Sequence, residues 1–203
     1  MIDKNLTIHD KFKELSDYLL NQCVLNINGI KYRLTEIEFY YRDNNHMDEY
    51  THKNDEQLEY EKIYFHKMQN GFTYKGGTFK GMDISLGDKI NKKYYGVLIR
   101  SMYNAEKDEF IEGPCNCVNK LLELHNFINV KDFMNSRNEK LIDLCDANES
   151  VKLEACNLQK EIVYYGPRIG LSKDKYPEYR QKLYRCVIMK NRIKKEKSKL
   201  KQL

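Results

Sequence analysis

Four apolar residues near the start of the chain recur at the spacing of one helix face. They are Ile8, Phe12, Leu15 and Leu19. Thr7 precedes them and is of a type that caps helix N-termini, so the pattern predicts a helix over about residues 8–21. Two apolar runs follow, Cys23–Ile27 and Ile30–Tyr41, separated by an Asn-Gly pair that favours tight turns. They predict a β-hairpin.

The rest of the chain mixes polar stretches with short apolar runs. Residues 44–60 are polar and acidic without a clear period, which indicates a long loop with short helical pieces. Helices are predicted to begin at Gly113-Pro114 and to lie within Val130–Leu144. Strands are predicted at four runs: Phe72–Leu86, Tyr94–Ser101, Val163–Leu171 and Leu183–Met189. The first of these runs is predicted to form two strands joined by a glycine turn. Because helices and strands do not alternate as βαβ units, we expect an α+β fold with a curved, mostly antiparallel sheet and surrounding helices.

Length and composition are those of one ordinary globular domain. The chain has 203 residues, of which 41% are hydrophobic and 32% charged. Its longest apolar runs, such as 96–99, are far too short to cross a bilayer, and the N-terminus lacks the apolar segment of a signal peptide. The six cysteines are scattered without a CxxC pair, which favours free thiols in a reducing compartment. We therefore expect an intracellular monomer, in the cytoplasm or the nucleus, that does not associate with membranes.

Positive charge is concentrated at the C-terminus. The net charge is +5, and residues 190–201 hold seven basic residues against one acidic residue, or +6. The remainder of the chain is therefore close to neutral. We expect a domain over residues 1–189 and a basic tail over residues 190–203 that attracts phosphate backbones in a salt-sensitive way. A solvated helical extension is the alternative. The expected contacts are Lys190, Arg192, Lys194 and Lys195.

The strand predicted at Tyr32–Tyr40 contains two carboxylates. Side chains alternate along a strand, so Glu36, Glu38 and Tyr40 share one face, and Ile37, Phe39 and Tyr41 share the other, which is the expected core face. A carboxylate beside aromatic rings suits an enzyme that excises bases, since the carboxylate activates water and the rings hold a flipped base. The alternative is an exposed strand face paired with lysines of a neighbour.

Two other charged residues lie within apolar strands. Asp83 suggests the wall of a site that is open to a ligand, or alternatively a residue that caps a turn. Arg100 ends an apolar strand, where it can hold a carboxylate or phosphate, or form a surface ion pair. The histidines lack metal-ligand spacing, and neither a GxSxG elbow nor a P-loop is present. We expect neither a metal ion nor a cofactor.

Five short motifs occur in the order found in the alkyladenine (3-methyladenine, methylpurine) DNA glycosylase family, which the chain resembles over roughly residues 16–188. They are Leu34–Tyr40 (LTEIEFY), Gly71–Ile84, Gly96–Arg100 (GVLIR), Gly113-Pro114 and Pro167–Leu171 (PRIGL). The resemblance implies that Glu38 is the glutamate that activates water, with Arg100 beside it in the catalytic site. It places Tyr40 on an aromatic residue that stacks on the flipped base, and Tyr74 near a second one.

Other positions match this family less closely. Asp83 lies where the family has an asparagine at the back of the pocket, which changes the base edge that is accepted. The family has a histidine between the catalytic strand and the next motif, and His46 is a loose counterpart. Arg168 matches the arginine of the late RIG motif. The family's tyrosine that wedges into the duplex has no counterpart, because Gly76, Gly77 and Lys80 occupy that region.

The function expected from these residues and this resemblance is that of a monofunctional DNA glycosylase in base excision repair, which flips out and removes a modified, alkylated purine. Its partner is DNA, duplex or single-stranded, contacted by Lys75, Lys80 and Arg168 as well as by the tail, and Glu36 joins the substrate-binding residues. One alternative is an N-glycosidase or hydrolase acting on a nucleoside, a nucleotide or RNA. Another is a non-catalytic nucleic-acid-binding module of the same fold.

Overall fold

A curved antiparallel sheet forms the centre of the structure, a computed structural model that describes residues 7–173 and 176–203. Within these residues it has ten strands, in the order β7-β3-β4-β5-β2-β1-β8. Off this path β10 pairs with β2, β9 pairs with β10, and β6 pairs with β5. The strands are β1 (Cys23–Ile27), β2 (Ile30–Arg42), β3 (Tyr60–Phe65), β4 (Met82–Leu86), β5 (Tyr94–Asn104), β6 (Glu109–Glu112), β7 (Ile142–Asp143), β8 (Val151–Ala155), β9 (Tyr164–Gly166) and β10 (Arg185–Val187).

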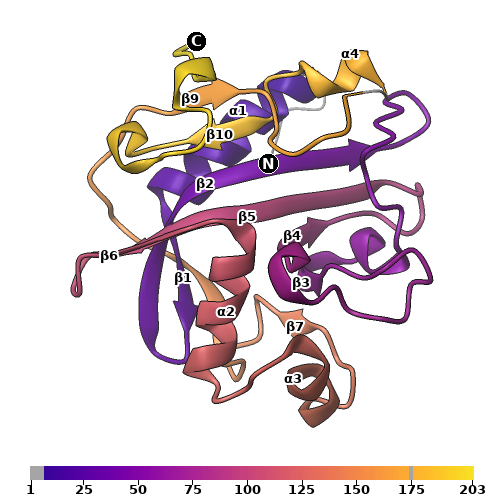
Figure 1. Cartoon of the computed structure of the whole chain (residues 1–203), viewed down its shortest axis with the longest axis vertical. Helices are drawn as coiled ribbons and strands as arrows, with labels where there is room; N and C mark the ends of the chain where they lie inside the picture. The colour runs from indigo at the N-terminus through magenta and orange to yellow at the C-terminus, as the bar shows by residue number, and fades with distance from the viewer. Residues whose placement is uncertain (1–6, 174–175) are drawn as a thin grey trace.

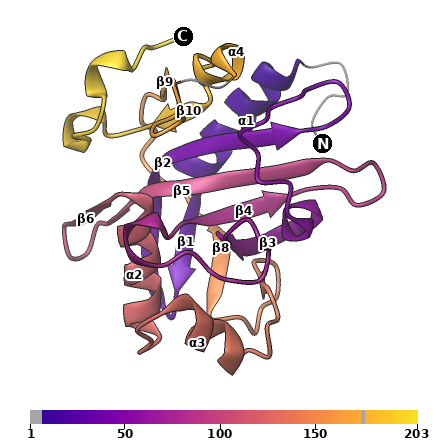
Figure 2. The same ribbon diagram turned by 45° about the vertical axis from the view of Figure 1, so that its right-hand side comes forward.

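Helices surround this sheet, which confirms the α+β fold (Figure 1). The α-helices are α1 (Ile8–Asn21), α2 (Pro114–Leu124), α3 (Val130–Ser136) and α4 (Pro177–Arg180), and the short 3-10 helices are η1 (Asp55–Leu58), η2 (Gly77–Phe79), η3 (Lys190–Arg192) and η4 (Lys197–Lys199). Both views place α2 and α3 at one end of the molecule and α4 with the C-terminal segment at the other (Figures 1 and 2). No helix in the described ranges is long and apolar enough to cross a membrane.

The predicted N-terminal helix and hairpin are both confirmed. Thr7 accepts a hydrogen bond from the backbone N–H of Asp10, which caps α1, and the Asn-Gly turn joins β1 to β2. Phe12 of α1 stacks on Phe39 of β2, with 4.3 Å between ring centroids, and both rings are buried. Helix α1 therefore covers the sheet face that was expected to form the core.

Helix α2 also begins where the Gly-Pro pair predicts. Gly113 has a φ of +105°, in the left-handed region that favours glycine, and Pro114 occupies the first helical turn. The N–H of Gly113 donates to the carbonyl of Arg100, which ties the start of the helix to β5. The helix then buries four residues against the sheet: Cys117, Val118, Leu121 and Leu122.

Two expectations about the chain require correction. In Phe72–Leu86 only the last five residues form a strand. Phe72 and Phe79 are 88% and 78% exposed, and in the described part of the chain neither pairs with a strand, while Tyr74 forms an isolated bridge to Lys67. The basic tail is not a solvated extension either. Ile193 and Leu200 are buried against β10, and the N–H of Lys201 donates to the Tyr165 carbonyl at 2.8 Å. The tail is part of the folded domain.

Candidate active site

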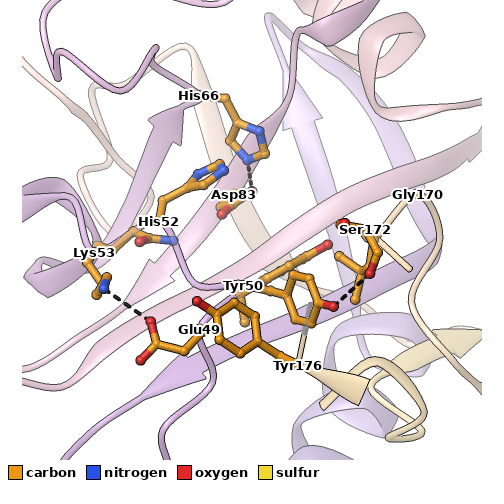
Figure 3. Close-up of a pocket in the computed structure, with 12 residues that line it drawn as sticks. Glu49, Tyr50, His52, Lys53, His66, Asp83, Gly170, Ser172 and Tyr176 are labelled. Carbon is orange, nitrogen blue, oxygen red and sulfur yellow. Dashed lines mark hydrogen bonds and ion pairs between the residues drawn. The ribbon is translucent and has the colours of Figure 1, made fainter. Parts of the chain in front are cut away.

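A cavity of about 470 Å³ lies on the sheet face opposite α1. Segments far apart in the sequence line it: the end of β2, residues 49–57, the β3–β4 region, residues 170–172 and Tyr176. The rings of Tyr50 and Tyr176 lie next to each other, with centroids 5.6 Å apart, on one side of the view, and His52, His66 and Asp83 lie on the other (Figure 3). The walls thus combine aromatic rings with groups that form hydrogen bonds.

One row of paired residues across the sheet positions the charged groups of this site. Arg185 of β10 is opposite Glu38 of β2, Glu38 is opposite Leu98 of β5, and Leu98 is opposite Asp83 of β4. Paired residues of antiparallel strands direct their side chains to the same face. Glu38 and Asp83 therefore share the cavity face, two strand spacings or about 10 Å apart.

Glu38 is buried next to Tyr40, which lines the cavity. Its carboxylate is fully buried and accepts two hydrogen bonds, from the Ile169 N–H at 2.7 Å and from the Tyr40 hydroxyl at 2.9 Å. Nε of Arg100 lies 3.4 Å from Oε1 of Glu38. Burial raises the pKa of Glu38, against the opposing effects of Arg100 and the Ile169 N–H. Because Tyr40 lines the cavity, its hydroxyl connects Glu38 to the space where a ligand would bind.

Glu36 has a different environment. Its Oε1 accepts hydrogen bonds from Arg100 Nε at 3.0 Å and Arg185 Nε at 2.7 Å, and its Oε2 accepts one from the Ser101 hydroxyl at 2.8 Å. It does not line the cavity, contrary to its expected role in substrate binding. Glu36 instead forms ion pairs with two buried arginines, Arg100 and Arg185, and it fixes Arg100 next to Glu38. Arg100 itself is 5% exposed and, through its contact with Oε1, helps to position the Glu38 carboxylate.

Arg168 is a structural residue, which corrects its expected contact with nucleic acid. Its side chain is buried and forms hydrogen bonds to both oxygens of Asp48, at 2.6 and 3.1 Å. It also donates to the Phe39 carbonyl, and its guanidinium lies 4.5 Å from the centroid of the Tyr40 ring. A buried guanidinium on the ring face holds Tyr40 in place. Nε of Arg168 has no hydrogen-bond partner in the described residues, but it is buried and therefore not accessible to a phosphate on the surface.

Two histidines that the sequence analysis did not select are part of the cavity wall. Nε2 of His66 lies 2.7 Å from Oδ1 of Asp83, and the His52 ring is 4.6 Å from the His66 ring (Figure 3). Burial and the neighbouring His66 lower the pKa of His52 to about 4, so His52 is neutral at pH 7. They come from a loop and a strand end without a shared motif, so no sequence signal joined them.

The side chains of Asp83 and Gln57 can pack against β5 behind the cavity because residue 96 is glycine. A Cβ atom there would lie 2.4 Å from Oδ2 of Asp83 and 2.9 Å from Nε2 of Gln57. Gln57 is 1% exposed, and its Oε1 has no hydrogen-bond partner in the described part of the chain. Asp83 and Gln57 therefore present polar atoms together at one point of the wall.

Two expected binding residues lie elsewhere. His46 packs among tyrosine rings, 5.5 Å from Tyr41 and 5.8 Å from Tyr184 between centroids, and is not at the cavity. Tyr74 lines a separate groove, where its hydroxyl donates to Glu139 at 2.7 Å. Both lie in long connections, whose course in space is not determined by local periodicity. Over the described ranges, no group of three His, Cys, Asp or Glu side chains has the arrangement of a metal site.

The chain has a relative of similar length among known proteins. It is 45% identical over 206 residues to uncharacterized protein L759 of Acanthamoeba polyphaga mimivirus, an alignment that covers 96% of this chain and 93% of the relative. The chain belongs to the L759 family. No family model matches it. Identity at this level over almost the whole length means that the L759 family shares the fold described above. The name of the relative gives no activity, so function is argued from the cavity.

Proposed function

We propose that the protein is a monofunctional N-glycosidase that removes a modified purine from DNA by attack of water at C1′. The observation that supports this most is the fully buried carboxylate of Glu38 next to Tyr40, which lines a cavity walled by tyrosines, histidines and Asp83. An enzyme that excises a nucleobase needs two groups side by side. One is a carboxylate that accepts a proton from the attacking water, and the other is a pocket that holds the flipped aromatic ring.

The chemistry follows from the contacts of Glu38. A water molecule at the cavity floor attacks C1′ as the bond to the purine breaks, and its proton passes through the Tyr40 hydroxyl to Glu38. The raised pKa of Glu38 makes it a stronger base than an exposed glutamate. Its negative charge also stabilises the positive charge that develops on the sugar ring. Arg100 and the Ile169 N–H keep the carboxylate oriented.

The walls of the cavity suit a purine. A volume of about 470 Å³ accommodates a purine ring, and a cationic alkylated ring gains about 0.5–2 kcal/mol from each tyrosine face that it contacts. Asp83 and Gln57 are placed to accept and donate hydrogen bonds at a base edge. Among the described residues that line the cavity the one lysine is Lys53, and it pairs with Glu49, so a Schiff-base intermediate and strand cleavage are not expected.

The resemblance to alkyladenine DNA glycosylases supports the same function. The motifs that carry this resemblance come from separate parts of the chain. Asp83 from one of them lines the cavity, while Glu38, Arg100 and Arg168 from others lie behind Tyr40 and contact each other, Tyr40 or the 168–169 backbone. The family has a histidine between the catalytic strand and the next motif, and in this chain the histidine of that stretch that lies at the cavity is His52 rather than His46.

The test is a single-turnover screen of base release on alkylated, deaminated and oxidised purines. Each base is offered in duplex DNA, single-stranded DNA, RNA and as the free nucleoside. Release from an alkylated oligonucleotide, without strand cleavage, is the expected result. Base release from nucleosides alone, or from RNA alone, would mean that this molecule and not DNA is the substrate. Binding to DNA without release of any base would favour a non-catalytic module.

A further inference from the structure

A second hollow of about 750 Å³ adjoins the candidate active site. Its first wall is the connection between β3 and β4, residues 66–81, and its second wall is the segment around Ile128 and the start of α3. We call this hollow the lysine groove. The two ends of the 66–81 segment are fixed to each other, because the His66 N–H donates to the Gly81 carbonyl at 2.9 Å and the Lys75 N–H donates to the His66 carbonyl at 2.8 Å.

The lysine groove is directly connected to the cavity wall. Nζ of Lys75, which lines the groove, lies 3.5 Å from Nε2 of His52, which lines the cavity. His66, at the cavity, is followed at once by Lys67, at the groove. A chain molecule with one unit in the cavity would therefore place its next unit in the groove.

Lysines outnumber acidic side chains in the groove. Lys67, Lys75, Lys80 and Lys131 line it together with Asp132 and Glu139, which accept hydrogen bonds from Asn129 and Tyr74. Lys67 pairs with Glu56 at 2.8 Å, whereas Lys80 contacts only the neutral amide of Asn119, and Lys75 has no carboxylate within ion-pair distance in the described ranges. Burial lowers the pKa of Lys75 relative to a free lysine, so removal from water is costly there and an anion would offset that cost.

Large apolar side chains flank these lysines in full contact with solvent. Phe72 and Ile128 both line the groove and are 88% and 92% exposed. Single exposed apolar residues are common, but two at the edges of one basic groove are typical of a surface that a partner covers. A lysine pair beside an exposed aromatic ring fits the two repeating parts of a nucleic-acid strand, phosphate and base.

We propose that the lysine groove binds the nucleic-acid strand next to the base in the cavity, with Lys75 and Lys80 on phosphates and Phe72 stacked on an unpaired neighbouring base. The proposal rests on the proposed function, because the strand is the continuation of the substrate. It names a contact that is independent of Glu38 and that needs no catalysis to be measured.

The experiment measures fluorescence anisotropy of a labelled single-stranded 20-mer DNA across a range of salt concentrations, with the full chain. Phe72→Ala should weaken binding about 5- to 100-fold, as for other aromatic residues that stack on bases. Phe79→Ala is the matched control, since Phe79 is 78% exposed on the same segment but does not line the groove. Its affinity should be unchanged.

The lysines are tested by salt dependence. The double change Lys75→Gln and Lys80→Gln should reduce the slope of log K against log salt by about 1.4, two phosphate contacts on a single strand. Lys11→Gln with Lys13→Gln on α1, which packs on the opposite face of the sheet, should leave the slope unchanged.

Several outcomes would overturn the groove assignment. Equal losses from Phe72→Ala and Phe79→Ala would mean a non-specific apolar surface. If the groove variants bind DNA with the affinity and the salt dependence of the wild type, the groove is not part of the interface. If those variants still release the base, the glycosidase proposal stands. A wild-type protein that binds no nucleic acid at all would end both proposals.

Discussion

Replacing Glu38 with glutamine tests the proposed chemistry most directly. The amide has the size of the carboxylate and can still accept the hydrogen bond from the Ile169 N–H, which is 2.7 Å long in the wild type. It cannot take a proton from water. Loss of a general base lowers rates by about 10²–10⁴-fold. This corresponds to about 2.7–5.5 kcal/mol in the activation free energy.

The assay is single-turnover release of an alkylated purine from an oligonucleotide, with alkali cleavage of the abasic product as the readout. Affinity for the same oligonucleotide should be unchanged, because Glu38 is buried and does not itself line the cavity. A lower rate with equal affinity locates the loss in the transition state.

The stability of the Glu38→Gln variant has a defined pH dependence. Since burial raises the pKa of Glu38 from its usual 4.5, folding favours the protonated form. The stability that this provides is present at low pH and is lost as the pH rises through the folded-state pKa. The amide stays neutral, so the free energy of unfolding of the variant should equal or exceed that of the wild type at pH 8 and lose this advantage near pH 4.

Glu36→Gln is the matched control. Glu36 lies on the same strand as Glu38 and is also buried, but it accepts hydrogen bonds from Arg100 and Arg185. Breaking buried ion pairs costs up to about 3–5 kcal/mol of folding free energy. Its urea midpoint should therefore fall, while base release by the folded fraction changes far less than in Glu38→Gln. If Glu36→Gln abolishes release and Glu38→Gln does not, the assignment of the catalytic carboxylate is wrong.

Three further predictions concern the cavity and the tail. Asp83→Asn replaces an acceptor with a group that also donates, so the ratio of kcat/KM for a cationic alkylated purine over a neutral deaminated purine should fall at least about 10-fold; an unchanged ratio would remove Asp83 from base recognition. Gly96→Ala places a Cβ 2.4 Å from Oδ2 of Asp83, so it should lower the free energy of unfolding in urea by about 1–3 kcal/mol and also slow base release; full activity would mean that the positions of Asp83 and Gln57 do not matter for release. Deletion of residues 190–203 exposes the surface that Ile193 and Leu200 cover and should lower stability by about 3–6 kcal/mol, which an unchanged urea midpoint would contradict.

Local patterns in the sequence were sufficient to predict the elements that depend on neighbours along the chain. The spacing of apolar residues predicts α1, the Asn-Gly pair predicts the β1–β2 turn, and alternation in β2 assigns Phe39 to the core. A helix needs contacts three or four residues apart, and a strand needs alternation over two, so both leave a periodic record in the sequence.

Contacts between distant segments were decided only by the tertiary structure. Glu36 and Glu38 have equivalent positions in the strand pattern, and they differ because Arg100 and Arg185, 64 and 149 residues from Glu36, bind mainly to it. His52, in turn, lies at the cavity because of the course of a long polar loop. Strand pairing and loop paths depend on contacts that have no period along the chain, so the sequence identified the catalytic candidate, and the fold determined which groups surround it.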